Sequence, residues 1–167
     1  MKLHIENLHV TLHAPQQQPA GLLATLAIAS AAGGIMGNQS APQIGEKWPS
    51  TEATYAGVSL STSGDRLVHL LLWDSDTDNA MDHDDAVKHA EAVNPAMASH
   101  LPTRHQAITL FDNLQDRFNW DYWHWTLTKT NSGKAAFVQD FYDGLQDNYN
   151  LSAECRVRAV RLIQLGS

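Results

Sequence analysis

Five aspartates between Asp74 and Asp85 are spaced like the ligands of a calcium-binding loop. Positions 1, 3, 5, 9 and 12 of that pattern are taken by Asp74, Asp76, Asp78, Asp82 and Asp85. The chain departs from the pattern at Asn79, where glycine is usual, at the short final aspartate, and in the strand expected before the loop. These departures favour a solvated acidic loop, whose last residues cap a helix. Calcium remains the alternative interpretation.

The other metal-ligating residue types do not form a recognisable motif. The nine histidines include no HExxH sequence, and His9 and His13, which are four residues apart, lie in a strand-like segment. Cys155 is the only cysteine, so an intramolecular disulfide and a multi-cysteine zinc site are both excluded. We expect Cys155 to be a small buried residue, and we expect no catalytic metal and no cofactor.

Aromatic residues crowd the segment from Trp120 to Trp125. If this segment is a strand, alternation places Trp123 and Trp125 on one face and Tyr122 and His124 on the other. Two indoles would supply much of the buried area of a small domain, so we assign the tryptophan face to the core. Tyr122 and His124 are then predicted to face outward.

Polar and aromatic residues on neighbouring elements could complete a binding face around these two side chains. Flat rings stack on sugar rings, peptides or nucleotides, while amides and carboxylates fix the orientation of the ligand. Arg156 and Arg158 could grip an anionic group, or could form structural ion pairs instead. The alternative for the whole face is an ordinary solvated sheet surface. The predicted ligand-binding residues are Tyr122, His124, Asp140, Tyr142, Gln146, Asn148, Arg156 and Arg158.

Composition limits the class of partner. The chain has 167 residues and a net charge of -7, which argues against a nucleic-acid backbone or an anionic membrane surface as its main partner. The apolar stretch 22–32 would reach only about 16 Å as a helix, too short to span a bilayer. No basic residue immediately precedes it, so we expect neither a signal peptide nor a transmembrane segment.

The order of elements predicts an α+β protein. Residues 1–40 are expected to form an extension, with a strand at 3–12 and a helix at 19–30, and the main domain to occupy 41–167. No formally charged residue occurs between His13 and Glu46, so the extension packs either on its own domain or on another subunit, which would make a homo-oligomer.

Within the main domain, a hairpin is expected over 54–73 and a helix over 86–93, capped by Asp82. A second helix begins at the capping box formed by Thr103 and Gln106. Short strands are expected at 122–128, 135–142 and 156–162.

The stretch 100–161 resembles the Lcl C-terminal-like domains of unknown function, which occur in phages, prophages and bacterial surface proteins. With the first hairpin included, the resemblance covers roughly residues 41 to 163. Two positions depart from it: His83 stands where relatives often have tryptophan, and the segment before Gln43 has no counterpart. The residues that carry it are Leu101-Pro102-Thr103-Arg104, Phe111, Asn113-Leu114, Phe118, Tyr122-Trp123-His124-Trp125-Thr126, Val138-Gln139-Asp140-Phe141, Asp143-Gly144, Gln146, Arg156-Val157-Arg158-Ala159-Val160-Arg161 and, upstream, Tyr55-Ala56-Gly57 and His69-Leu70.

The resemblance implies a C-type-lectin-like fold, in which two helices flank a small twisted antiparallel sheet and the first and last strands lie side by side. It implies binding of a protein or carbohydrate ligand without catalysis, by a protein that is phage or prophage encoded and acts in adhesion or host interaction. Such a protein is either cytoplasmic in the producing cell or virion-associated. Two alternatives stay open: a protein that sequesters a small molecule, and an oxygenase-like enzyme of the formylglycine-generating fold, which would need paired cysteines or iron-binding histidines.

Overall fold

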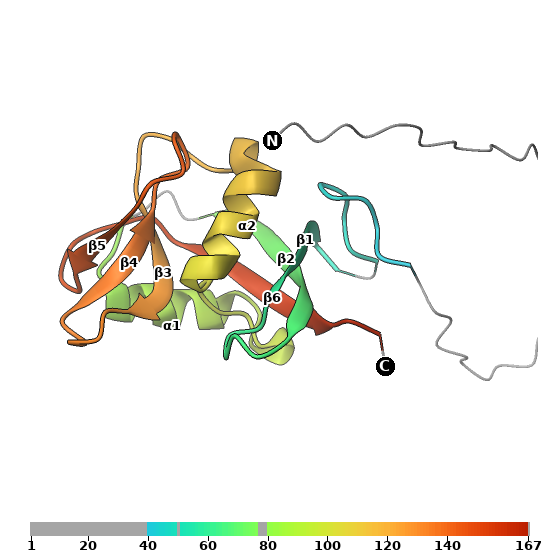
Figure 1. Cartoon of the computed structure of the whole chain (residues 1–167), viewed down its shortest axis with the longest axis horizontal. Coiled ribbons are helices and arrows are strands. Elements are labelled where there is room, and N and C mark those ends of the chain that lie inside the picture. Colours follow the sequence, from blue (N-terminus) through green and yellow to red (C-terminus); the bar gives the residue numbers. More distant parts are fainter. Residues whose placement is uncertain (1–39, 50, 77–79, 167) are drawn as a thin grey trace, which may run out of the picture. The chain divides into compact units, whose positions relative to one another are not determined.

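A computed structural model describes residues 40–49, 51–76 and 80–166 of the chain (Figure 1). This part is α+β, as predicted, with two α-helices and two three-stranded antiparallel sheets. The strand expected at 3–12, the helix expected at 19–30 and all of the extension 1–40 except Ser40 lie outside the described residues.

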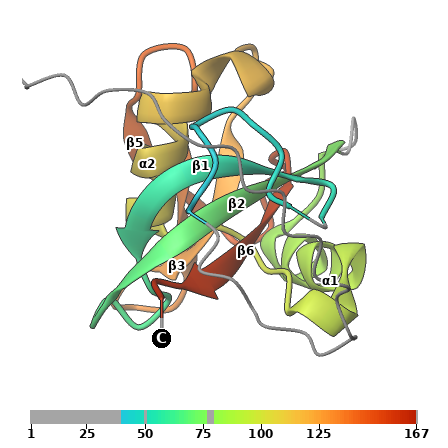
Figure 2. The same ribbon diagram turned by 90° about the vertical axis from the view of Figure 1, so that its right-hand side faces the viewer.

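The first sheet contains the predicted hairpin. Its strands are β1 (Ala53–Leu60), β2 (Leu67–Asp76) and β6 (Arg158–Gln164), in the order β1-β2-β6. The hairpin turn includes Gly64 at φ 77°, and Asp65 accepts hydrogen bonds from Ser61 and Ser63. The family resemblance implies adjacent first and last strands. Among the described strands, β6 instead pairs with β2, and β1 lies at the opposite edge (Figure 2).

Both predicted helices are present with their predicted caps. Helix α1 (His83–Val93) begins after Asp82, whose carboxylate accepts the backbone N–H of Asp85 at 2.9 Å. A 3₁₀ turn, η1 (Pro95–Met97), follows it. Helix α2 (Arg104–Leu114) begins with the capping box of Thr103 and Gln106 and continues into a second turn, η2 (Gln115–Arg117).

The second sheet contains a strand that the sequence pattern did not predict. The sheet consists of β3 (His124–Lys129), β4 (Ala135–Gln139) and β5 (Gln146–Asn150), in that order. Strand β5 has the sequence QDNYN, which has no alternation of apolar and polar residues, and it lies at an edge of the sheet. It forms through its backbone pairing with β4, from Ala135 opposite Asn150 to Gln139 opposite Gln146.

Helix α2 contacts strands of both sheets, namely β1, β3 and β4 (Figure 1). Two of its side-chain amides also bind the backbone of β1. Gln106 donates to the carbonyl of Leu60 at 3.0 Å, and Asn113 donates to the carbonyl of Ala56 at 2.8 Å. These bonds satisfy carbonyl groups of a strand that lies at the edge of its sheet. Helix α2 therefore packs on the core and also covers a strand edge.

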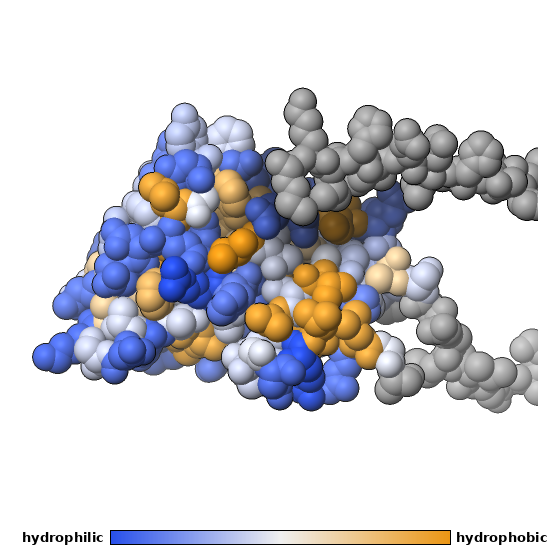
Figure 3. All heavy atoms as spheres, viewed as in Figure 1, coloured by the Kyte–Doolittle hydropathy of each residue, from blue (hydrophilic) through white to orange (hydrophobic). Residues whose placement is uncertain are grey.

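The core lies on both sides of the central strand β2. Leu70 and Leu72 belong to a cluster with residues of α2, whereas Leu71 and Trp73 belong to a cluster with residues of α1 and β3. All four side chains are buried, in keeping with the position of β2 at the centre of its sheet. Hydrophobic side chains also reach the surface over the first sheet (Figure 3). Val58 and Leu67, which lie near the turn of the hairpin, are among the exposed ones.

Candidate functional site

Strand β3 begins with His124 and Trp125, the last two residues of the aromatic segment, and is buried on both faces at its start. Trp125 is fully buried, stands perpendicular to the ring of His83 at 5.1 Å, and donates its indole N–H to the carbonyl of Met81 at 2.9 Å. Its assignment to the core is confirmed. Trp123 precedes the strand and is half-buried against Tyr149, with ring centroids 5.5 Å apart.

The prediction that His124 faces outward is wrong, because the side chain is only 3% exposed. Its ring lies edge-on to Phe118 and Phe141, at centroid distances of 5.3 and 5.1 Å. The two phenylalanine rings stack on each other at 3.6 Å and belong to the core cluster beneath α2. Alternation correctly assigned His124 and Trp125 to opposite faces of β3. The face of His124, which was expected to be exposed, is covered by α2 and the two phenylalanine rings.

Burial also determines the charge of His124. Neither ring nitrogen makes a hydrogen bond of normal geometry with a described residue. Loss of hydration, followed by repulsion from the nearby Arg158 guanidinium, lowers the pKa of His124 to about 3. The imidazole is therefore neutral at physiological pH and is shielded from any ligand at the surface.

Arg158 is likewise an internal side chain, 5% exposed, and not a surface anion-binding group. Its guanidinium donates to the carbonyls of Arg117 and Trp73 and lies 4.8 Å from the ring centre of Phe118. It thus connects β2, the η2 turn and β6. Arg156 is half-buried, and its guanidinium lies over the ring of Tyr122 at 4.2 Å. Of these two arginines, Arg156 is the one that meets an exposed ring of the predicted site.

The remaining predicted residues separate into two groups. Asp140 accepts the backbone N–H of Tyr142 at 2.7 Å, which orders the turn that carries the exposed Tyr142 ring. Gln146 instead binds within the fold, donating to the backbone carbonyl of Arg104 at 2.9 Å and to the side chain of Gln139 at 2.8 Å. Asn148 is exposed on β5. The eight predicted residues therefore do not form one continuous face.

Three exposed rings lie on turns near the covered face, and we call them the aromatic rim: Trp120, Tyr122 and Tyr142. They are 50%, 45% and 69% exposed. Gln115 connects two of them, because its carbonyl accepts the Trp120 indole N–H at 3.1 Å and its amide donates to the carbonyl of Tyr142 at 3.1 Å. Sequence reasoning placed Trp120 in the aromatic cluster but not in the site. The polar residues on either side of it, Asn119 and Asp121, are the feature of the sequence that could have indicated its exposure.

The aspartates of the possible calcium loop are largely occupied by other partners. Asp74 accepts the Thr54 hydroxyl and pairs with Lys47, Asp82 caps α1, and Asp85 pairs with Lys88 at 2.8 Å. Positions 77–79 lie outside the described residues. Within the described ranges, no three His, Cys, Asp or Glu side chains are placed to hold a metal ion. These contacts support the capping interpretation.

Cys155 is buried, as predicted, and burial raises the pKa of its thiol to about 12. The thiol is therefore protonated and a poor nucleophile. In the part of the chain that the structure describes, no helix combines the length and apolar character that a membrane span requires.

The fold and the site together define a small α+β protein with a rigid interior and an exposed aromatic rim. A scan against protein-family models found no matching family, and a search of curated proteins found no match either.

Proposed function

We propose that this chain is a non-enzymatic binding module that recognises a protein or carbohydrate ligand through the aromatic rim. The observation that carries the proposal is the exposure of Trp120, Tyr122 and Tyr142 on turns that backbone and side-chain hydrogen bonds hold in place. Large exposed rings on an ordered surface are typical of recognition sites, since a ligand that covers them gains stacking and burial with little loss of conformational freedom.

Polar groups beside the rings supply the directional part of recognition. The Arg156 guanidinium over Tyr122 holds that ring in one orientation. Asp140 uses one carboxylate oxygen for the backbone of Tyr142, and a carboxylate has further lone pairs to offer a ligand hydroxyl or amide. Stacking on the rings and hydrogen bonds to these groups would suit a saccharide or a polar peptide segment.

The C-type-lectin-like fold is part of this proposal. It is supported by the succession of a hairpin, two capped helices and short strands that follow each other in the expected order. Two features differ from the fold that the resemblance implies: β6 lies beside β2 instead of β1, and the described strands form two three-stranded sheets instead of one. By its resemblance we also propose a phage or prophage origin and a location in the virion or in the cytoplasm of the producing cell. The absence of charge between His13 and Glu46 is the basis on which we propose a homo-oligomeric state. Neither a nucleic acid nor a membrane is the proposed partner, because the net charge of -7 repels both.

Binding is favoured over the oxygenase-like alternative by the chemistry of the available side chains. That alternative needs paired cysteines or an iron-binding histidine set. The chain has one cysteine, which is buried and protonated. His83 and His124 are buried against the rings of Trp125 and Phe118, and within the described residues no three His, Cys, Asp or Glu side chains are placed to hold a metal ion.

A combined glycan and protein array, probed with the full chain, tests the proposal. The wild type is expected to bind at least one member, and a variant carrying Trp120→Ala, Tyr122→Ala and Tyr142→Ala is expected to lose that signal. A matched control replaces exposed apolar residues outside the rim, Ile44→Ala, Leu67→Ala and Ile108→Ala, and should bind as the wild type does. Equal binding by the rim variant and the control would refute the rim as the site.

A further inference from the structure

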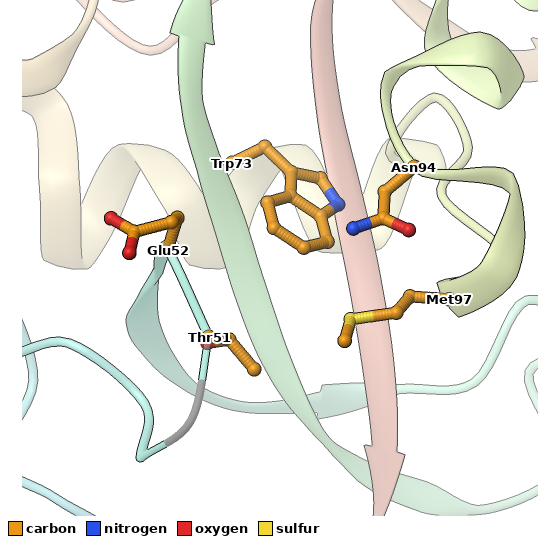
Figure 4. A pocket seen from close by; sticks show the side chains of 5 residues that line it. All are labelled: Thr51, Glu52, Trp73, Asn94 and Met97. Atoms are coloured by element: carbon orange, nitrogen blue, oxygen red, sulfur yellow. The ribbon is translucent and has the colours of Figure 1, made fainter.

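An open pocket of about 390 Å³ lies between the start of β1 and the end of α1 (Figure 4). Thr51 and Glu52 line it from the segment before β1, Trp73 from β2, and Asn94 and Met97 from the segment after α1. None of these residues belongs to the aromatic rim. Volumes of this order hold small organic ligands in other proteins.

Much of the pocket wall is apolar. The hydroxyl of Thr51 is committed to the backbone, since it donates to the carbonyl of Trp48 at 3.0 Å and accepts the N–H of Ala53 at 3.2 Å. Its methyl group is therefore available to the pocket. Figure 4 shows the Trp73 indole, the Met97 thioether and the Thr51 side chain around a common space. Ala53 pairs with Trp73 across the sheet and is small, which leaves room beside the indole.

Two hydrogen-bond donors meet at one end of this pocket without an acceptor between them. Trp73 is 6% exposed, and its indole nitrogen makes no hydrogen bond with a described residue. The amide nitrogen of Asn94 faces it (Figure 4). The backbone of Asn94 is fixed by a bond from its N–H to the Ser99 hydroxyl at 2.9 Å. A buried donor without an acceptor is costly, so an oxygen atom between these two groups would be favourable.

We propose that this pocket binds a small planar molecule through a carbonyl or carboxylate oxygen, which accepts hydrogen bonds from the Trp73 indole and the Asn94 amide. The apolar body of the ligand contacts the Thr51 methyl group and the Met97 thioether. The Asn94 side chain rotates to admit the oxygen, because the indole nitrogen is covered in the empty pocket. This function is capture of a small molecule, and it is independent of recognition by the rim.

Nuclear magnetic resonance of the full chain, labelled with ¹⁵N and with ¹³C in its methionine methyl groups, tests the proposal with benzamide and benzoate as probes. The chain has five tryptophans, and Trp73→Phe identifies the Trp73 indole resonance by its disappearance. We expect that resonance to shift saturably with at least one probe and not with toluene, which has the ring but no oxygen. The Met97 methyl resonance reports binding in the variants. Trp73→Phe should weaken binding about tenfold, and the control Trp120→Phe should not change it.

Asn94→Asp provides a second variant that does not disturb the core. Its carboxylate can accept the indole N–H, so it should compete with a ligand oxygen and weaken binding of benzamide about tenfold. An indole resonance of Trp73 that does not respond to either probe would overturn the proposal, because the oxygen of Asn94 itself would then satisfy the indole. Equal affinities for wild type, Trp73→Phe and Asn94→Asp would overturn it as well.

Discussion

His124 is a polar residue in an apolar environment, and its burial makes the stability of the protein depend on pH. Its neutral ring lies among Phe118, Phe141 and Arg158, with a pKa lowered to about 3. In the unfolded chain the imidazole returns to its ordinary pKa near 6.5. Between these values the unfolded state binds a proton that the folded state does not, so stability is present above pH 6.5 and is lost as the pH falls toward 3.

We therefore expect His124 alone to lower the free energy of unfolding by about 1.4 kcal/mol for each pH unit between about pH 6.5 and pH 4. Urea unfolding at a series of pH values measures it. His83 and His100 also have pKa values lowered by burial and act in the same direction. His124→Leu separates the contributions, since it should reduce the slope by close to one proton. An unchanged slope in His124→Leu would show that this histidine is accessible to protons in the folded state.

Two tryptophans allow a direct comparison of buried and exposed rings. Trp125→Ala removes a fully buried indole and should cost about 3–5 kcal/mol of stability, whereas Trp120→Ala removes a half-exposed one and should cost about 1 kcal/mol or less. Chemical denaturation of both variants measures the difference. Similar losses would contradict the assignment of Trp125 to the core and of Trp120 to the rim.

The sequence was sufficient to place Trp125 inside, because a large apolar ring on a strand is most stable against the core. It was not sufficient to place His124, because alternation shows only that two residues face opposite ways. Which face is covered depends on where α2 and Phe141 pack, and that is a property of the tertiary structure. The same holds for Arg158, whose hydrogen bonds go to carbonyls far away in the sequence.

At the scale of elements, helix α2 depends strongly on one buried side chain. Gln106 is fully buried, accepts the backbone N–H of Thr103 at 2.9 Å, and donates to the carbonyl of Leu60 at 3.0 Å. Gln106→Leu leaves both groups without a partner and should cost about 2–4 kcal/mol. Thr103→Ala removes one cap bond and should cost only about 1 kcal/mol. Urea denaturation measures the loss of stability in both variants. A larger loss in Thr103→Ala than in Gln106→Leu would contradict this role of Gln106.

The acidic segment before α1 supplies a second prediction for an element. Because Asp82 caps the helix and Asp74 and Asp85 have basic partners, we expect no heat of calcium binding by calorimetry at millimolar calcium. We also expect Asp82→Ala to cost about 1 kcal/mol, with or without calcium. A saturable heat that disappears in Asp82→Ala would establish the calcium interpretation instead.

Elements with strong local signals were predictable. The Asp82 cap and the capping box at Thr103 depend on side chains that bind backbone only a few residues away. The hairpin turn depends on hydrogen bonds that Ser61 and Ser63 donate to the Asp65 carboxylate. Strand β5 has no such signal, because its polar residues form a strand only by pairing with β4. Two of the three rim residues, Tyr122 and Tyr142, were predicted as site residues, and Trp120 was not.

At the scale of the whole molecule, the extension 1–40, which has no formally charged residue after His13, predicts self-association. Light scattering of the full chain should give a mass larger than the 18.4 kDa of one chain. A shortened chain that lacks residues 1–40 should give the mass of a monomer. The same number of chains per particle in both proteins would contradict an oligomer formed through the extension.

The central claim is that the rim rings bind a partner and are dispensable for folding. Its most direct test is binding and urea unfolding of the same variant, in which Trp120, Tyr122 and Tyr142 are all replaced by alanine. We predict a free energy of unfolding lowered by no more than about 2 kcal/mol, together with loss of binding to the array member that the wild type recognises. A folded variant that still binds would contradict the claim, and so would a variant that cannot fold.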